Sequence, residues 1–376
     1  MYDVIVIGAG LSGAVFADRF ARVLGKRVLV VEKRNHIAGN CHDYVNEDGI
    51  LMNQYGLHLF HCNDKKTFDY IRQFSEWIRY DHKVVAQTEK GLVPIPVCIE
   101  TVNRLCNTHI TDANEMDEWL KHSQIKNKIE NGEDACKARV GEQLYYELFH
   151  DYTKKQWDKY PCELDKSVLE RIPVRNNHDT RYFNDTYQVI PKHGYTAFVS
   201  NMLDHPLITV KLGMDYNTIS EQSWFLNRTW LIYTGPVDSY FHNSGLAPLE
   251  YRSIEFKIER VPIKGFYQKN VVVNYPNKNV DFTRIVEYKH LPYNDSTTES
   301  TTIVREYTTS KGEPYYPVPT RMNQELYAQY KKLAEKEEEK NVIFVGRLAN
   351  YKYKNMNEAI LDSLNLFEER VLGVKV

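Results

Sequence analysis

The sequence predicts an α/β protein in which a helical lobe and an antiparallel sheet are inserted into a domain built on a parallel sheet. Three observations predict this fold. The chain opens on an apolar run, a glycine-rich turn, a helical pattern and a second apolar run. From Thr101 to about Leu169 the pattern is mostly helical and charged. Between about Tyr251 and Pro319 the apolar segments are short and alternate, as antiparallel strands do.

The N-terminal segment has the order strand, turn, helix and strand. Apolar residues over Asp3–Ile7 predict a buried strand, Leu11–Leu24 has helical spacing, and Arg27–Val31 predicts a second strand. Glu32 ends that second strand. A glycine turn and a terminal acid in this context are typical of a Rossmann-like dinucleotide-binding unit.

The turn between the first strand and the helix is Gly8-x-Gly10-x-x-Gly13. Gly8 permits a tight turn, Gly10 lets the backbone approach a pyrophosphate, and Gly13 lets the helix pack close to the strand. The start of the helix, at Ser12, offers N–H groups and a partial positive charge to phosphates. Glu32 is placed to accept hydrogen bonds from a ribose hydroxyl. These five residues are therefore predicted cofactor contacts.

A second turn of small residues bears on which dinucleotide binds. After the acid, Lys33 leads into Ala38-Gly39-Asn40. Such a turn indicates that the backbone wraps farther along the cofactor, as in FAD-binding chains. An NAD-binding chain would instead continue into another βα unit. FAD is therefore favoured over NAD, and Lys33, Gly39 and Asn40 join the predicted FAD contacts.

The rest of the parallel sheet is predicted from segments far along the chain. Ile208–Leu212 and Trp230–Tyr233 are apolar strands, and Val342–Leu348 is another, followed after a tyrosine-rich turn by a helix over Asn357–Leu372. A C-terminal strand, turn and helix that return to the N-terminal unit would close an FAD domain.

The segments between these strands are less distinctive. Lys65–Tyr80 predicts an amphipathic helix, and Lys83–Val97 predicts a hairpin that turns at Lys90-Gly91. Gly132 and Gly141 are expected to interrupt the helical lobe. We expect three interwoven units: the FAD domain over 1–64, 191–245 and 340–376; the helical lobe over 65–80 and 98–170; and the antiparallel substrate domain over 81–97, 171–190 and 246–339.

Composition limits the possible partners. The net charge of −2 argues against bulk nucleic-acid binding, and no apolar run reaches membrane-spanning length. The chain leads straight into a core strand, which leaves no room for a signal peptide. The six cysteines have no metal-ligand spacing, and we interpret them as reduced thiols of a cytoplasmic protein. The 27 tyrosines suit nucleotide and sugar recognition, because each joins a flat apolar face to a hydroxyl.

Two histidines, His58 and His61, follow the glycine-led turn that begins at Tyr55. A pair at this spacing can mark a metal site, but no third ligand stands nearby in the sequence, and no metal is predicted. His58 is the better candidate for a place beside a flavin, and His61 for a structural role.

With these segments placed, the chain resembles the UDP-galactopyranose mutases of the prokaryotic type. The resemblance runs nearly end to end and is specific through the order and spacing of its stretches. They are Gly8–Gly13, Glu32–Asn40, Tyr55–His61, Asp151–Trp157, Arg171–Val174, Arg181–Phe183, Thr283–Ile285, Pro314–Pro317 and Gly346–Met356.

The resemblance implies a reaction without net redox change. In that family, N5 of reduced FAD attacks the anomeric carbon of UDP-galactopyranose and UDP departs. The ring then opens, recloses as the furanose and is recaptured by UDP, to supply cell-surface polysaccharide biosynthesis. The expected partners are a UDP-sugar, an external reductant such as NAD(P)H or a reductase, and a second copy of the chain in a homodimer.

The resemblance also implies roles for individual residues. Arg171 and Arg284 are the implied cations for the departing UDP, which suits the planar, permanently charged guanidinium. His58 is the implied catalytic histidine beside the flavin. Implied substrate contacts are His82, Tyr152, Thr153, Trp157, Tyr182, Asn274, Tyr316 and Tyr353. Further implied cofactor contacts are His58, Leu59, Asp215, Tyr216, Arg347, Asn355, Met356 and Asn357.

Three positions depart from the family pattern and leave the identity of the sugar open. Leu57 stands where a small residue or proline is common, His82 replaces an asparagine, and Asn355 replaces an aspartate. Galactose and close analogues, such as N-acetyl or deoxy sugars, are the alternatives. Two other classes stay open: an FAD-dependent oxidoreductase of the amine-oxidase type, and a nucleotide-sugar binder without activity.

Overall fold

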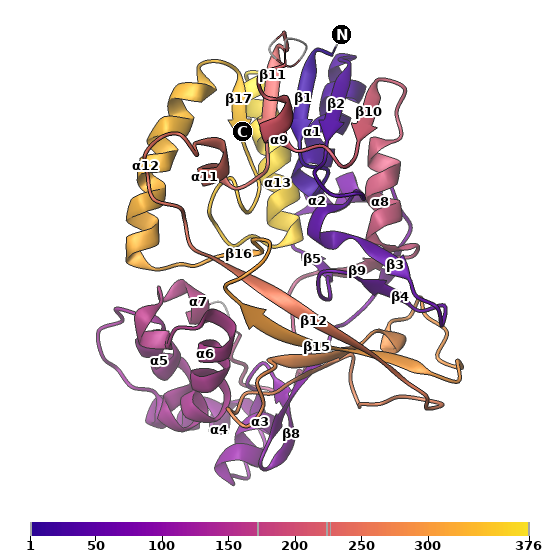
Figure 1. Ribbon diagram of the computed structural model, residues 1–376. Helices are drawn as coiled ribbons and strands as arrows, with labels where there is room; N and C mark the ends of the chain where they lie inside the picture. Colours follow the sequence, from indigo (N-terminus) through magenta and orange to yellow (C-terminus); the bar gives the residue numbers. More distant parts are fainter. Residues whose placement is uncertain (1, 171–172, 223–224, 226, 375–376) are drawn as a thin grey trace.

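The computed structural model describes residues 2–170, 173–222, 225 and 227–374. Figure 1 shows three parts: a body built on a parallel sheet, a helical lobe at the opposite end, and a long twisted sheet between them. The body contains both the N-terminal strand and the C-terminal helix, so segments from the two ends of the sequence lie side by side (Figure 1).

The body is organised around a five-stranded parallel sheet of order β10-β2-β1-β11-β17. Alternate residues of its central strand point to opposite faces, and both faces are covered. Val4 and Val6 pack under α1, α8 and α13, while Ile5 and Ile7 pack against α12. A sheet covered on both faces needs apolar residues at every position, and all four residues of β1 are buried. The predicted parallel α/β domain is confirmed.

The elements of this body have the following bounds. They are β1 Val4–Ile7, α1 Leu11–Leu24, β2 Val28–Val31, η1 Gly39–Cys41, α8 Gly194–Leu203, β10 Ile208–Lys211, α9 Tyr216–Ile219, β11 Trp230–Tyr233, α11 Val237–Tyr240, α12 Arg321–Glu338, β17 Val342–Phe344, α13 Met356–Leu366 and η5 Phe367–Val371. The strands predicted near 208, 230 and 342 therefore join β1 and β2 as expected.

The long sheet has seven strands in the order β16-β12-β15-β14-β13-β7-β8. All its pairs are antiparallel except β13 with β7, which run parallel. Its elements are β7 Val84–Thr88, β8 Gly91–Ile95, β12 Tyr251–Val261, β13 Val272–Asn274, β14 Arg284–Glu287, η4 Tyr288–His290, β15 Thr301–Thr309 and β16 Tyr316–Pro317. The predicted hairpin is present, and its turn is at Glu89-Lys90, between Thr88 and Gly91. Gly91 begins β8 with a φ of +92°, which suits a residue without a side chain.

The helical lobe packs on one face of the long sheet and shares a hydrophobic core with it. Its elements are α3 Ile99–Cys106, α4 Ala113–Ser123, α5 Gly132–Leu144, η2 Tyr145–His150, α6 Asp151–Trp157, η3 Pro161–Glu163 and α7 Ser167–Glu170. Both predicted glycine breaks are present. Gly132 begins α5, and Gly141 kinks it with a φ of +79°. A Cβ on Gly141 would also lie 2.5 Å from the Ser123 carbonyl oxygen, so the position requires glycine.

Two small sheets join the body to the long sheet, and one of them corrects the sequence analysis. Their strands are β3 Asp43–Val45 with β4 Leu51–Asn53, and β5 Phe60–Cys62 with β9 Tyr187–Pro191 and β6 Trp77–Arg79. The helix predicted over 65–80 ends early, as α2 Lys65–Ile71. Trp77 instead pairs with Pro191 of β9 and packs on Phe60, so tertiary pairing overrides the local helical periodicity.

Candidate active site

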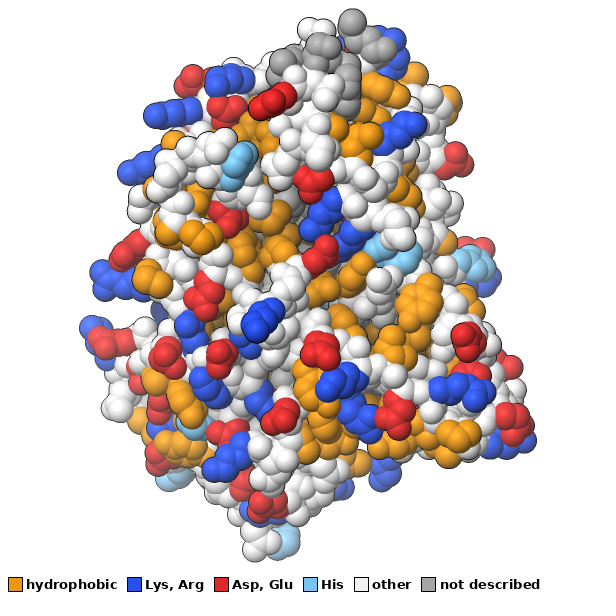
Figure 2. Space-filling view, in the orientation of Figure 1, with side chains coloured by type: hydrophobic (Ala, Val, Ile, Leu, Met, Phe, Trp, Pro, Cys, Tyr) orange, Lys and Arg blue, Asp and Glu red, His pale blue; other side chains and the backbone are white. Residues whose placement is uncertain are grey.

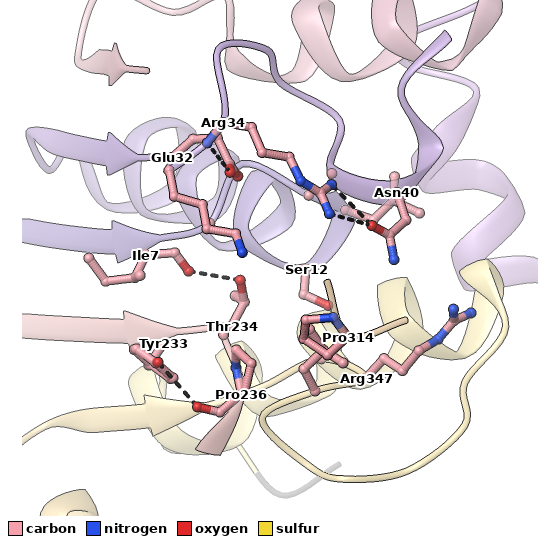
Figure 3. A pocket seen from close by; sticks show the side chains of 18 of the residues that line it. Ile7, Ser12, Glu32, Arg34, Asn40, Tyr233, Thr234, Pro236, Pro314 and Arg347 are labelled. Carbon is pink, nitrogen blue, oxygen red and sulfur yellow. Dashed lines mark hydrogen bonds between the residues drawn. The ribbon is translucent and has the colours of Figure 1, made fainter. Parts of the chain in front are cut away.

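A cavity of 360 Å³ opens where the strands of the parallel sheet end. Its walls include Ile7 at the end of β1, Glu32 just after β2, and Tyr233 and Thr234 at the end of β11 (Figure 3). Ligands of open α/β sheets bind outside the carboxyl ends of the strands, so this is the expected place for a cofactor.

Most of the predicted cofactor residues line this cavity. They are Gly8, Gly10, Ser12, Glu32, Lys33, Gly39, Asn40, His58, Asp215, Tyr216, Arg347, Asn355 and Met356. Gly13, Leu59 and Asn357 are not among its lining residues. Gly13 has a packing role instead, because a Cβ on it would lie 2.0 Å from the carbonyl oxygen of Gly8.

The two glycine turns meet at the floor of the cavity. A Cβ on Gly39 would lie 3.0 Å from the Cα of Gly10, so the backbones of the two turns are in close contact here. Gly8, with a φ of +103°, allows the sharp turn before α1. Among the described residues, no side chain caps the start of α1 at Gly10. Its first N–H groups are therefore free to meet a phosphate.

Glu32 is held rigidly at one end of the cavity. Its side chain is buried, one carboxylate oxygen accepts from the Ala9 N–H at 2.8 Å, and the other accepts from the Arg34 N–H at 2.9 Å. Each carboxylate oxygen has a further lone pair for a ribose hydroxyl. Figure 3 shows the neighbouring Arg34 reaching Asn40, to which it donates two hydrogen bonds of 3.0 Å.

Arg347 marks the other end of the cavity. Its guanidinium lies 5.3 Å from the ring centre of Tyr316 and 5.0 Å from that of Tyr353, and these two rings stack at 5.7 Å. It also donates to the Lys354 carbonyl at 2.6 Å. Burial raises the pKa of Tyr316 to about 12, so its hydroxyl keeps its proton at neutral pH.

His58 lines the same end and is neutral. Its Nδ1 donates to the Gly56 carbonyl at 2.7 Å, which leaves Nε2 as an acceptor. Burial lowers the pKa of His58 to about 4, and the positive charge of Arg347 adds to this effect. His61, by contrast, pairs through Nδ1 with Asp185 at 2.9 Å. In the described part of the chain, no group of three or more potential ligands is placed to hold a metal ion.

A second cluster lies on the long sheet, on the face toward the helical lobe. Asn274 of β13 is directly opposite Arg284 of β14, which is directly opposite Glu306 of β15. Residues opposite one another on neighbouring strands share a face, so these three side chains form a row. We call them the arginine row. Nε of Arg284 donates to Glu306 at 2.7 Å, and Glu306 is 2% exposed.

The arginine row has charge and unused hydrogen-bonding capacity. Burial opposes the charge of Arg284, but the Glu306 carboxylate, together with Tyr152 and Tyr316, more than offsets this effect and raises the pKa of Arg284. Oε1 of Glu306 and Oδ1 of Asn274 are buried without a partner among the described residues. Because Arg284 uses Nε toward Glu306, its two terminal amino groups can serve a phosphate as a fork.

His82 lies beside the row and is also neutral. The residue is 4% exposed, its Nδ1 has no partner among the described residues, and its ring packs 5.6 Å from that of Tyr182. Burial lowers the pKa of His82 to about 3, and the charges of Arg284 and His61 act in the same direction.

Helix α6 contributes the remaining predicted substrate residues. Thr153 and Trp157 are buried, and the ring of Trp157 lies 6.4 Å from that of Tyr316. Burial raises the pKa of Tyr152, and the nearby charge of Arg284 opposes that rise. Tyr316 contacts Arg347, which lines the cofactor cavity, and it also lies near Arg284. Tyr316 is therefore located between the cavity and the cluster around Arg284. Arg171 lies outside the described residues.

Sequence reasoning missed several residues that build the site. Glu306 could have been found, because it shares the buried face of β15 with Thr302 and Val304, where an unpaired carboxylate would be costly. Glu313 gave no such signal. It pairs with Lys33 at 3.2 Å and with Arg34, and it lines the cavity together with Pro314.

The fold and the cavity define a Rossmann-like dinucleotide-binding protein, and the model of the NAD(P)-binding Rossmann-like domain matches residues 6–74. The model of the UDP-galactopyranose mutase family matches residues 147–353, which carry most of the residues around Arg284. The chain belongs to the UDP-galactopyranose mutase family and is an enzyme of the isomerase class. The resemblance seen in the sequence is thereby confirmed.

Similar proteins cover the chain almost completely. A probable UDP-galactopyranose mutase from Klebsiella pneumoniae is 31% identical over 99% of this chain and 95% of its own. A UDP-galactopyranose mutase from Mycoplasma pneumoniae is 33% identical over 98% of this chain and 96% of its own. A dTDP-fucopyranose mutase from Escherichia coli is 31% identical over 97% of both chains.

Solved structures show that the fold is shared with proteins of another class. The crystal structure of a reduced UDP-galactopyranose mutase matches with a TM-score of 0.78 and 15% identity, over 100% of this chain and 94% of that one. A putative protoporphyrinogen oxidase from Exiguobacterium matches with a TM-score of 0.64 and 11% identity, over 99% of both chains. The fold alone therefore does not distinguish a mutase from an oxidase.

Proposed function

We propose that this protein is an FAD-dependent mutase that interconverts the pyranose and furanose forms of UDP-galactose or of a close analogue. One observation carries the proposal. A partly buried cation, Arg284, lies with the hydroxyls of Tyr152 and Tyr316 next to the end of a dinucleotide cavity. An amine oxidase would need an apolar substrate cage there, whereas this cluster suits a diphosphate.

The residues of the cavity fit FAD. The uncapped start of α1 and the crossing of the glycine turns at Gly10 and Gly39 form a backbone cradle for a pyrophosphate. Glu32 suits a ribose at one end, and the cavity continues to His58 and Arg347 at the other, farther than the first βα unit alone reaches. The chemistry that reduced FAD supplies when it is bound is a nucleophilic nitrogen, N5, toward the anomeric carbon of the sugar.

The protein's own residues bind and orient the nucleotide-sugar. Arg284, together with Arg171 by the family resemblance, would neutralise the charge that develops on UDP as it departs. Tyr182, Tyr316 and Tyr353 would add hydrogen bonds to the diphosphate without adding charge. Helix α6 would hold the uridine through Tyr152, Thr153 and Trp157, and Asn274 would contact the nucleotide-sugar.

Two neutral histidines suit a sugar that must change its ring form. His58 presents Nε2 as an acceptor at the flavin end, and its low pKa keeps this nitrogen free of a proton at neutral pH. His82 presents a buried ring nitrogen beside Tyr182. Neither histidine adds a charge that would compete with the arginines for the diphosphate.

The identity of the sugar is the open part of the proposal. Relatives at 31% identity include both a probable UDP-galactopyranose mutase and a dTDP-fucopyranose mutase. Leu57 and His82 depart from the family pattern near the sugar. Asn355 is a milder change, because it is the N-cap of α13, where asparagine and aspartate serve equally well.

The test is turnover by the reduced enzyme. Protein loaded with FAD and reduced with dithionite is incubated with UDP-galactofuranose, and with dTDP-fucofuranose in parallel, and the pyranose products are separated by chromatography. We expect turnover only with reduced protein, and an external donor such as NAD(P)H or a reductase should replace dithionite. Turnover by oxidised protein, or oxygen consumption with an amine, would favour the oxidase instead.

A further inference from the structure

The ammonium group of Lys155, on helix α6, lies inside a loop of the long sheet. Its Nζ donates to the backbone carbonyls of Tyr275 at 2.5 Å, Asn277 at 2.9 Å, Phe282 at 3.0 Å and Val280 at 3.3 Å. An ammonium has three N–H groups, so at least one is shared between two of these oxygens. Four carbonyls of one loop therefore converge on a single cation.

This loop connects the two strands that carry the arginine row. Strand β13 ends at Asn274 and β14 begins at Arg284, and the loop between them is closed by the Tyr275 N–H, which donates to the Thr283 carbonyl at 2.9 Å. Carbonyl dipoles that point at one another repel without a cation between them. The Lys155 ammonium thus stabilises the loop whose two ends position Asn274 and Arg284.

The same lysine belongs to the helix that carries the predicted uridine contacts. Lys155 follows Tyr152 and Thr153 and precedes Trp157 in α6. Its own carbonyl accepts a hydrogen bond from Thr308 of β15, so its backbone is also anchored to the long sheet. Burial lowers the pKa of Lys155 to about 8, although the carboxylates of Asp151 and Asp281 oppose this, and the ammonium form prevails at pH 7.

We propose that Lys155 is a positioning residue that fixes Arg284 relative to helix α6, and so sets the spacing between the diphosphate site and the nucleoside site. This inference rests on the proposed function, because it takes UDP as the ligand that spans both sites. Lys155 does not itself have to touch the ligand. Its effect passes through the loop to Arg284.

The test compares a ligand that spans both sites with one that occupies only the nucleoside site. Binding of UDP and of uridine to the FAD-loaded protein is measured at pH 7 by calorimetry or ligand-observed NMR. In Lys155→Met we expect UDP to bind about tenfold or more weakly, the effect of a displaced charged contact, and uridine to bind within about twofold of wild type. Lys154→Met is the matched control, because Lys154 is its neighbour on α6 but pairs with Asp158.

A double-mutant cycle with Arg284→Ala separates positioning from general support of the fold. If Lys155 acts through Arg284, adding Lys155→Met to Arg284→Ala should weaken UDP by less than about threefold more. Equal losses for UDP and uridine, full additivity, or an unchanged UDP affinity in Lys155→Met would each overturn the inference.

Two further measurements distinguish a failure of this inference from a loss of FAD and from a failure of the proposed function. If Lys155→Met does not retain FAD, Lys155→Arg replaces it, and the same selective loss for UDP is expected because the guanidinium cannot reproduce the position of the ammonium. An unchanged UDP affinity in Lys155→Arg would likewise overturn the inference. If wild-type protein binds no UDP at all, the proposed function fails, independently of Lys155.

Discussion

The dinucleotide end and the substrate end of the site are built in different ways. Around the glycine turns, the backbone forms the site, and glycines leave the space that a cofactor would occupy. Around Arg284, side chains from α6, β13, β14 and β15 make the site, and each comes from a different stretch of sequence. The first region should therefore fail when volume is added, and the second when charge or orientation is removed.

The surface of the molecule carries charges of both signs rather than one extended patch of positive charge. Figure 2 shows acidic and basic side chains interspersed over the visible face of the molecule. In the described part of the chain, no helix is long and apolar enough to cross a membrane. In the proposed function, the cation for the diphosphate would therefore be supplied locally by Arg284, which is paired with the buried carboxylate of Glu306.

Gly10→Val should have the largest effect, because it adds volume to the region that the backbone builds. A Cβ on Gly10 meets nothing closer than the Cα of Gly39 at 3.7 Å, so the substitution can be accommodated in the fold, but its side chain occupies the pyrophosphate cradle. We expect loss of bound FAD, measured by absorbance after heat release, with the far-UV circular dichroism retained. Gly13→Val is the contrasting control, since its Cβ would strike the Gly8 carbonyl and should prevent folding. Full flavin occupancy in Gly10→Val would show that the cradle lies elsewhere.

Arg284→Ala tests the other region, where charge is removed and no volume is added. We expect kcat to fall by about 10²–10³-fold, as for the loss of a group that stabilises developing charge. UDP affinity should fall only by the energy of one charged contact, about 1.5–3 kcal/mol. Lysine should rescue poorly, because it lacks the guanidinium fork. The flavin spectrum should not change. A raised KM with intact kcat would mean that Arg284 binds substrate and transition state equally.

Glu306→Gln should have a smaller effect in the same direction. Glutamine keeps the size of the side chain and one acceptor oxygen, but the acceptor loses its negative charge, which weakens the bond from Nε of Arg284. We expect kcat/KM to fall about tenfold, from a less firmly oriented guanidinium. Steady-state kinetics of the reduced enzyme measures this. In the Arg284→Ala background the same change should have little further effect, and an undiminished effect there would separate Glu306 from Arg284.

The last expected effect concerns stability at acid pH rather than turnover, and it arises from His82. Its folded pKa of about 3 lies below the usual value of 6.5, so the unfolded chain binds more protons between these values. Stability should therefore be lost as the pH falls below 6.5. Between pH 7 and pH 5 we expect this histidine to cost about 2 kcal/mol of unfolding free energy.

Urea denaturation of the FAD-loaded protein at the two pH values measures the effect of His82. His82→Asn should remove this part of the pH dependence, while His109→Asn, at an exposed position, should leave it unchanged. The idea fails if the His82 variant loses as much stability on acidification as wild type.

The sequence was most informative where a short stretch contains its own physical reason. Gly8, Gly10 and Gly13 predict a turn, a phosphate cradle and a helix contact, and Glu32 ends the next strand as expected. The apolar strands near 208, 230 and 342 were also predictable, because a parallel sheet covered on both faces requires continuous apolar runs. Where periodicity competed with pairing, over Trp77–Arg79, the pairing with β9 prevailed.

The sequence by itself determined the parallel sheet, the cofactor end and, through resemblance, the family. Only the tertiary structure decided how the substrate end is assembled: the cross-strand row of Asn274, Arg284 and Glu306, and the Lys155 ammonium inside the loop that joins two of its strands. The physical reason is the range of the interactions. A glycine turn depends on neighbouring residues, whereas the bond between Arg284 and Glu306 and the contacts of Lys155 depend on strand register and helix docking, which short sequence patterns do not record.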